Sequence, residues 1–220
     1  IYSIAIYFSQ TLLIIPEYGF ALGAAKTLGQ FKNNITKRSQ LFWDVQTIRF
    51  FLFSITYLIS IILINHFQIY SEARSIINLG ILIVFGNLLT QKWFYLGIGN
   101  MRLLMLMTLI PKLLSIPFIL IYVRKPEDLR IAFILYIIPI LITSFFSLNY
   151  IYSKKFFKGF SINFESTINE FKKDFPLFLS NISGKVYGLG TTMILANFVS
   201  PEAVGAYVGA DKLRIACQYI

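Results

Sequence analysis

The 220-residue sequence has few charged side chains for its length. Charged residues make up 14% of the chain and apolar residues 56%. The charged share is about half of that usual in soluble domains, which need polar groups to cover their surface. The composition therefore excludes an ordinary soluble enzyme and a disordered tail, and it predicts an all-α, polytopic membrane helix bundle.

Cysteine and histidine are almost absent, which limits the available chemistry. The single cysteine, Cys217, cannot form an intrachain disulfide or a cysteine-based metal cluster. The single histidine, His66, lies in an expected short loop without a second histidine to share a metal. The sequence also has no Gly-rich phosphate loop, nucleotide-binding motif or hydrolase motif. We therefore expect no metal site and no cofactor.

Long apolar runs predict seven membrane-spanning helices. A helix crosses ~30 Å of hydrocarbon with about 20 residues, and these runs lack the alternation of barrel strands. The first helix is expected to break at Pro16 and Gly19, and the last is incomplete. The expected helices are Ile1–Ile15 with a continuation over Ala21–Leu28, Phe50–Ile69, Ser75–Leu96, Leu103–Val123, Ile131–Tyr152, Phe175–Val199 and one from Glu202.

The net charge of +10 comes mostly from basic residues between the apolar runs, which favours membrane orientation over nucleic-acid binding. The side richer in basic residues carries Lys26, Lys32, Lys37, Arg38, Arg49, Lys92, Arg102, Lys154, Lys155, Lys158, Lys172 and Lys173. The other side carries Arg74, Arg124, Lys125 and Arg130. The positive-inside rule places the richer side in the cytoplasm. The first helix then runs inward, so we expect an odd number of helices before it if the N-terminus of the protein is cytoplasmic.

Ser153–Asp174 is the longest polar stretch of the chain. Its apolar residues recur at mixed three- and four-residue spacing, with Lys and Glu between them. This pattern is typical of an amphipathic helix lying on the cytoplasmic membrane surface, although a plain connecting loop with a helical turn remains open. In either case the segment is the natural seam between two helical bundles.

Several ionisable residues are expected deep in the membrane, where each costs roughly 2.5–3.5 kcal/mol unless it faces a cavity or a partner. Basic residues predominate, and a cavity with that balance attracts anions such as phosphate or pyrophosphate. We predict the basic residues to bind substrate and the acidic ones to couple transport to an ion. The candidates are Lys112, Lys185, Lys212 and Arg214 for substrate, and Asp211 and Glu17 for the ion.

Simpler structural roles remain open for these residues. Lys185 lies where a snorkelling side chain would strain to reach the cytoplasmic interface. Asp211 and Lys212 are adjacent in sequence and would neutralise each other. Glu17 would cap the helix that resumes after the expected break.

Four segments resemble bacterial polysaccharide flippases of the Wzx type, which translocate O-antigen and capsule repeat units. They are Glu17–Phe20, Trp93–Met101, Phe175–Ser180 and Ser200–Lys212. Their order and spacing both agree with that family, and the resemblance covers nearly the whole sequence. It identifies the chain as a fragment with helices two to eight of a multidrug, oligosaccharidyl-lipid and polysaccharide exporter.

The resemblance implies a transporter of two lobes, each with six or more helices, around a central cavity. Residues 1–152 would be first-lobe helices two to six, 153–174 a cytoplasmic interlobe linker, and 175–220 helix seven and part of helix eight. The implied activity is translocation of undecaprenyl-pyrophosphate-linked oligosaccharide across the bacterial inner membrane by alternating access. The implied partners are that lipid-linked substrate, the bilayer and other polysaccharide-assembly membrane proteins.

Three other functions remain open from the sequence. A multidrug exporter of the same fold would need deep carboxylates for cationic substrates, and few are present. A membrane-embedded glycan-processing enzyme would need a large outward loop or a paired His/Asp/Arg site. A structural subunit would leave the buried lysines unexplained.

Overall fold

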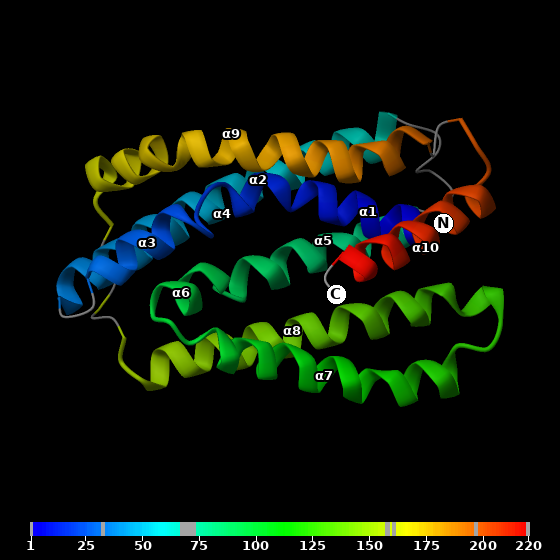
Figure 1. The fold of residues 1–220 in the computed structure, drawn as a ribbon, viewed down its shortest axis with the longest axis horizontal. Coiled ribbons are helices and arrows are strands. Elements are labelled where there is room, and N and C mark those ends of the chain that lie inside the picture. Colours follow the sequence, from blue (N-terminus) through cyan, green and yellow to red (C-terminus); the bar gives the residue numbers. More distant parts are fainter. Residues whose placement is uncertain are drawn as a thin grey trace.

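The computed structural model describes residues 2–31, 34–66, 74–156, 159, 162–195 and 198–218. Within these ranges the secondary structure is helical, with no strand, so the expected all-α fold is confirmed (Figure 1). The helices are α1 (Tyr2–Leu12), α2 (Ile14–Glu17), α3 (Gly23–Gln30), α4 (Ile35–His66), α5 (Arg74–Leu89), α6 (Lys92–Gly97), α7 (Met101–Tyr122), the 3-10 helix η2 (Pro126–Asp128), α8 (Leu129–Ser153), α9 (Phe164–Leu195) and α10 (Pro201–Gln218).

Four of the described helical stretches are long and apolar enough to cross a membrane. They are α4, the α5–α6 stretch Ile76–Gly97, α7 and α8. Each has at least the 20 or so residues that a bilayer crossing needs. The chain is therefore a multi-pass membrane protein.

Successive long helices run back and forth along the bundle (Figure 1). The α6–α7 turn, the end of α8 and the start of α9 lie at the same end of the molecule as α3, and the start of α8 lies at the opposite end. The loops predicted to be cytoplasmic are thus gathered at one end of the bundle. Its sidedness in the membrane stays a prediction.

Helix α4 is longer than the sequence pattern suggested, because it begins at Ile35 and not near Phe50. No proline or glycine interrupts Ile35–His66, and the Asn34 side chain accepts a hydrogen bond from the Lys37 backbone N–H at 3.0 Å. The assignment of Arg49 to a loop is therefore wrong. This residue lies inside α4 and is buried.

Helix α9 is also continuous where two elements were expected. Phe164–Asp174, interpreted from sequence as a separate surface helix or a loop, forms the first turns of the same helix that continues to Leu195. Pro176 lies inside it and removes one backbone hydrogen bond without ending the helix. Ser166 and Thr167 bind the buried carboxylate of Asp44 on α4, at 2.6 and 2.9 Å, which fixes these turns against the bundle.

Two breaks shape the helices around the interior. The first expected helix is broken, as predicted, and its turn contains Tyr18 with a φ of 43°. The expected helix Ser75–Leu96 is divided into α5 and α6 at Gln91, whose φ is 52°. A positive φ is costly for both residues, so the surrounding packing must hold them there.

Two apolar clusters form the core. One joins α1, α5, α8 and α10 and includes Phe8, Ile77, Phe133 and Val204. The other joins the α2–α3 region, α4, α6 and the end of α8. Helix α7 lies at the edge of the bundle (Figure 1), and most of its large apolar side chains are exposed, as expected of a face that meets lipid.

Candidate functional site

A cavity of about 850 Å3 lies between the membrane-spanning helices, and we refer to it as the polar cavity. Its volume is within the range of small-molecule binding sites. It is lined by Gln10, Leu13, Glu17, Ile83, Asn87, Thr90, Lys92, Thr108, Lys112, Ser115, Ile119, Tyr136, Pro139, Ile140 and Thr143.

The polar cavity is bounded by helices that are apolar elsewhere, yet most of its lining side chains are polar. An unsatisfied polar group in hydrocarbon is costly, so such side chains are stable in a membrane helix when they face water, protein or a polar ligand. The lining contains amide, hydroxyl and charged groups, which suit a ligand with both hydroxyls and negative charge.

Lys92, Asn87 and Glu17 form a charged group within the lining. Lys92 Nζ donates a hydrogen bond to Asn87 Oδ1 at 3.0 Å and lies 3.7 Å from Glu17 Oε1. The N-cap of α3 is Leu22, so the interpretation of Glu17 as the cap of the resumed helix is wrong. Glu17 instead lines the cavity and is paired with a lysine.

Lys112 lies at the middle of α7 and lines the same cavity. Among the residues that the structure describes, no carboxylate lies within ion-pair distance of its ammonium group. A lysine at this depth that lacks a protein counter-ion can be neutralised by an anionic ligand. The structure thus brings two of the predicted site residues, Lys112 and Glu17, into one cavity.

Arg49 is bonded to Asn87, which lines this cavity, and was not predicted as a site residue. Its guanidinium donates to Gln91 Oε1 at 3.0 Å and to the Asn87 backbone carbonyl at 3.2 Å, and it lies within electrostatic reach of Glu17. Gln91 in turn donates to Gln46 Oε1 at 2.7 Å. The sequence could have indicated that Arg49 lies in a helix, because no proline or glycine occurs between Ile35 and His66.

The other predicted site residues lie elsewhere. Arg214 on α10 pairs with Asp211 on the same helix, with Nη2 and Oδ1 2.8 Å apart, so Asp211 is neutralised by Arg214. Neither residue lines the polar cavity. The side chains of Lys185 and Lys212 are outside the described part of the structure, and their roles stay predictions.

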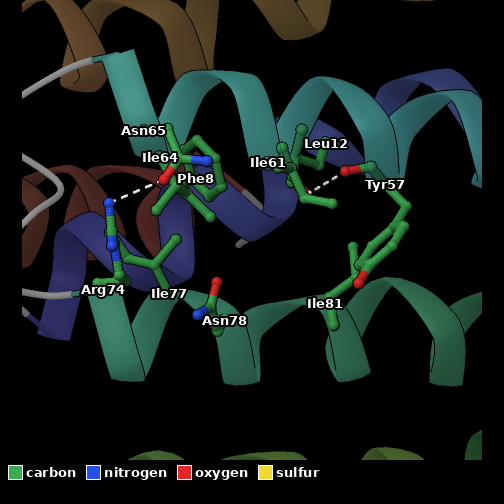
Figure 2. Close-up of a pocket in the computed structure, with 11 residues that line it drawn as sticks. Phe8, Leu12, Tyr57, Ile61, Ile64, Asn65, Arg74, Ile77, Asn78 and Ile81 are labelled. Atoms are coloured by element: carbon green, nitrogen blue, oxygen red, sulfur yellow. Dashed lines mark hydrogen bonds between the residues drawn. The ribbon is translucent and has the colours of Figure 1, made fainter.

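A second cavity, of about 410 Å3, lies between α1, α4 and α5 near the end of the bundle opposite α3 (Figure 2). Its lining includes the apolar side chains of Phe8, Ile61 and Ile77 and the polar side chains of Ser60 and Asn78. Arg74 is the charged residue among the described residues of its lining, and it donates to Asn65 Oδ1 at 2.8 Å (Figure 2). The polar cavity offers more groups for an anionic, hydroxyl-rich ligand and is therefore the stronger candidate.

The fold and the polar cavity together define a multi-pass helical membrane protein with a cavity between its helices. The whole chain, residues 1–220, matches the family described as "Polysaccharide biosynthesis protein", and the chain belongs to this family. The resemblance to polysaccharide transporters found in the sequence is thus confirmed at the level of the family.

Two curated relatives carry the name "Putative O-antigen transporter". The one from Escherichia coli (strain K12) is 23% identical and the one from Shigella dysenteriae 22% identical, each over 207 residues. The matches cover 94% of this chain and 50% and 52% of the two relatives, so the chain spans about half the length of the relatives. No solved structure matches the chain.

Proposed function

We propose that this chain is part of a flippase that moves undecaprenyl-pyrophosphate-linked oligosaccharide repeat units across the bacterial inner membrane by alternating access. Membership of the polysaccharide biosynthesis family and the names of the two relatives support polysaccharide or O-antigen transport. The lipid-pyrophosphate substrate and the alternating-access mechanism go beyond those names and are our proposal.

The observation that carries this proposal is the position of Lys112. Lys112 is one of the residues lining an 850 Å3 cavity between membrane helices, and it has no ion-pair partner among the described residues. A pyrophosphate oxygen would accept a charge-assisted hydrogen bond from its ammonium group. Asn87, Thr108 and Ser115 line the same cavity and offer groups that can bind sugar hydroxyls.

The charge balance of the cavity favours this substrate over a cationic drug. Among the described residues, Lys92 and Lys112 line it with one carboxylate, Glu17, and that carboxylate is already near Lys92. A multidrug exporter of cations would present an available carboxylate to its substrate. The cavity also supports transport in preference to enzymatic processing, because it offers a site for binding without a paired nucleophile and base.

The remaining predicted residues complete the proposal. Lys185, Lys212 and Arg214 would meet the substrate from the second lobe. Asp211 and Glu17 would couple transport to an ion gradient. Both carboxylates lie near a basic partner, Arg214 and Lys92 respectively.

Replacing Lys112 tests the site. In a strain lacking the full-length protein, we expect Lys112→Ala to restore surface glycan at least about tenfold less well than the unchanged gene, because one charge-assisted hydrogen bond is lost. Lipid-linked repeat units should accumulate in the inner leaflet. Lys112→Arg should retain much of the function, because it keeps the charge.

Arg130→Ala is the matched control, since this exposed basic residue lies outside the polar cavity. Full rescue by Lys112→Ala would remove Lys112 from the proposed site. Full rescue by Lys185→Ala would likewise remove Lys185. Normal surface glycan in the deletion strain itself would contradict the proposed function.

A further inference from the structure

The start of α9 packs closely against the turn between α2 and α3, and we refer to this contact as the α3–α9 seam. It joins the turn residues to a part of the chain more than 150 positions later, as shown by the bond from Tyr18 to Phe171, which are 153 residues apart. The seam is formed by Tyr18, Gly19 and Gly23 on one side and by Phe171, Asp174, Leu177 and Phe178 on the other.

Glycine is required at two positions of the seam. A Cβ atom at Gly19 would lie 2.5 Å from the Asp174 backbone oxygen and 2.8 Å from Leu177 Cβ. A Cβ atom at Gly23 would overlap the Asp174 carboxyl group. The two backbones therefore approach as closely as they do because neither glycine has a side chain.

Tyr18 closes the seam on its other side. Its ring lies between those of Phe171 and Phe178, with ring centroids 4.7 and 4.6 Å apart, and its hydroxyl donates to the Phe171 backbone oxygen at 3.2 Å. Glu17, the preceding residue, lines the polar cavity. A movement of the seam would therefore displace Glu17, one of the residues that line that cavity.

Asp174 is the unusual residue of this contact. It is 1% exposed, and neither carboxyl oxygen accepts a hydrogen bond of regular geometry from a described residue, although the Ala24 backbone N–H lies close enough to favour the charged form. A buried carboxylate without such bonds is costly, whereas a neutral carboxyl group costs much less.

The charged groups around Asp174 oppose one another. Glu170 on the same helix disfavours the ionised carboxyl and Lys173 favours it, while the α2–α3 side of the seam contributes the Tyr18 phenol and the backbone at Gly23 and Ala24. Burial, reinforced by Glu170, raises the pKa of Asp174 to about 6. The closed seam therefore binds a proton more tightly than an open, hydrated one, whose carboxyl would titrate near 3.9.

We propose that Asp174 is a proton-binding gate residue: the α3–α9 seam closes when its carboxyl group is protonated and parts when the group is ionised. This inference rests on the proposed function, because the seam residue Tyr18 directly follows Glu17, which lines the proposed substrate cavity. Closure is favoured as the pH falls through about 6 and is opposed at higher pH, because ionisation places an unsatisfied charge in the contact.

Spin labels on the two sides of the seam test this proposal in the full-length protein in lipid nanodiscs. Lys26 on α3 and Lys172 on α9 are both exposed and lie outside the seam, so Lys26→Cys and Lys172→Cys provide the labelling sites after the native cysteines, including Cys217, are replaced by serine. Pulsed electron paramagnetic resonance then gives the distribution of distances between α3 and α9.

We expect the ratio of the shorter to the longer distance population to rise about tenfold from pH 8 to pH 5. Asp174→Asn, which cannot ionise, should hold the shorter distance at both pH values. Gly23→Ala should hold the longer distance at both, because it blocks the close approach. Glu165→Gln removes an exposed carboxylate from the same helix and should keep the pH response of the unchanged protein.

A distance distribution that does not change with pH would overturn the proposal, as would an unaltered pH response in Asp174→Asn. If Asp174→Asn does not fold, the unchanged protein and Gly23→Ala still decide the outcome. The distance measurement is independent of surface glycan. A deletion strain with normal glycan would therefore contradict the transport function, whereas a pH-independent seam would contradict the gate.

Discussion

Arg49 is a fully enclosed cation within a membrane-spanning helix, and its hydrogen bonds join two elements. It reaches from α4 to Gln91 and to the backbone of Asn87, at the break between α5 and α6. Gln91 also accepts from the Trp93 indole at 3.0 Å. These bonds favour the positive φ of Gln91, because in this position its side chain bonds to three buried polar partners, Arg49, Gln46 and Trp93.

Replacing this cation should destabilise the protein. We expect Arg49→Leu to lower the free energy of unfolding by about 1–3 kcal/mol, because it leaves the hydrogen-bond acceptors of Gln91 and Asn87 with one donor fewer in a buried site. Arg49→Lys should have a smaller effect, since it keeps the charge. Thermal unfolding of the full-length protein in detergent measures both.

Arg102→Leu is the control for this comparison, because Arg102 is exposed at the start of α7. It should leave the unfolding temperature nearly unchanged. Equal stability of Arg49→Leu and Arg102→Leu would show that the buried network contributes little.

Sequence reasoning found some residues of the polar cavity and missed others. Lys112 and Glu17 were predicted because a charge in an apolar run is visible in the sequence. Arg49 was missed because the preceding polar residues made it look like part of a loop. Asp174 was missed because it stands at the end of a polar stretch, and only its contact with Gly23 shows that it is buried.

At the scale of elements, the close approach of α3 and α9 depends on the pattern of small residues in α3. Gly23 faces the Asp174 carboxyl group, whereas a Cβ at Gly29 would meet only the Gly97 backbone oxygen, at an ordinary 3.6 Å. The two glycines of one helix therefore have different roles. One permits a tight contact and the other leaves room for a methyl group.

This difference predicts opposite outcomes for two alanine substitutions. Gly23→Ala should destabilise the closed protein by about 1–3 kcal/mol, because the added methyl group overpacks the seam. Gly29→Ala should be neutral or slightly stabilising, because alanine favours the helix and meets no close neighbour. Thermal unfolding at pH 5 measures both, and equal effects would contradict the packing described for the seam.

The lengths of two helices also depended on contacts that the sequence does not display. The first turns of α9 are polar enough to be a surface helix or a loop, but Ser166 and Thr167 bind Asp44 and hold them on α4. The hydrophobic pattern alone places membrane boundaries where polarity begins. It cannot show that a polar turn continues the same helix.

At the scale of the whole molecule, the basic segments gather at one end, and the positive-inside rule places that end in the cytoplasm. Single cysteines at Lys172 and Glu127, in a background without other cysteines, test this orientation. Both positions are exposed, and the α7–α8 connection that contains Glu127 lies at the opposite end of the bundle from the start of α9, the helix that contains Lys172 (Figure 1). In spheroplasts, a membrane-impermeant thiol reagent should label Glu127→Cys and not Lys172→Cys.

Labelling after the membrane is permeabilised is the control, because Lys172→Cys should then react as well. The reverse pattern of labelling in spheroplasts would invert the topology. The α3–α9 seam would then lie at the outer end of the bundle and not at the cytoplasmic end.

The sequence by itself determined the all-helical membrane fold and most of the helices that cross the bilayer. These features depend on the length and continuity of apolar runs, which are local properties of the chain. The tertiary structure decided which polar groups meet: Lys112 with the Glu17–Lys92 pair around one cavity, Arg49 with Gln91, and Asp174 with Gly23. Those contacts join residues far apart in the chain, and their energies depend on burial and geometry, which no local pattern contains.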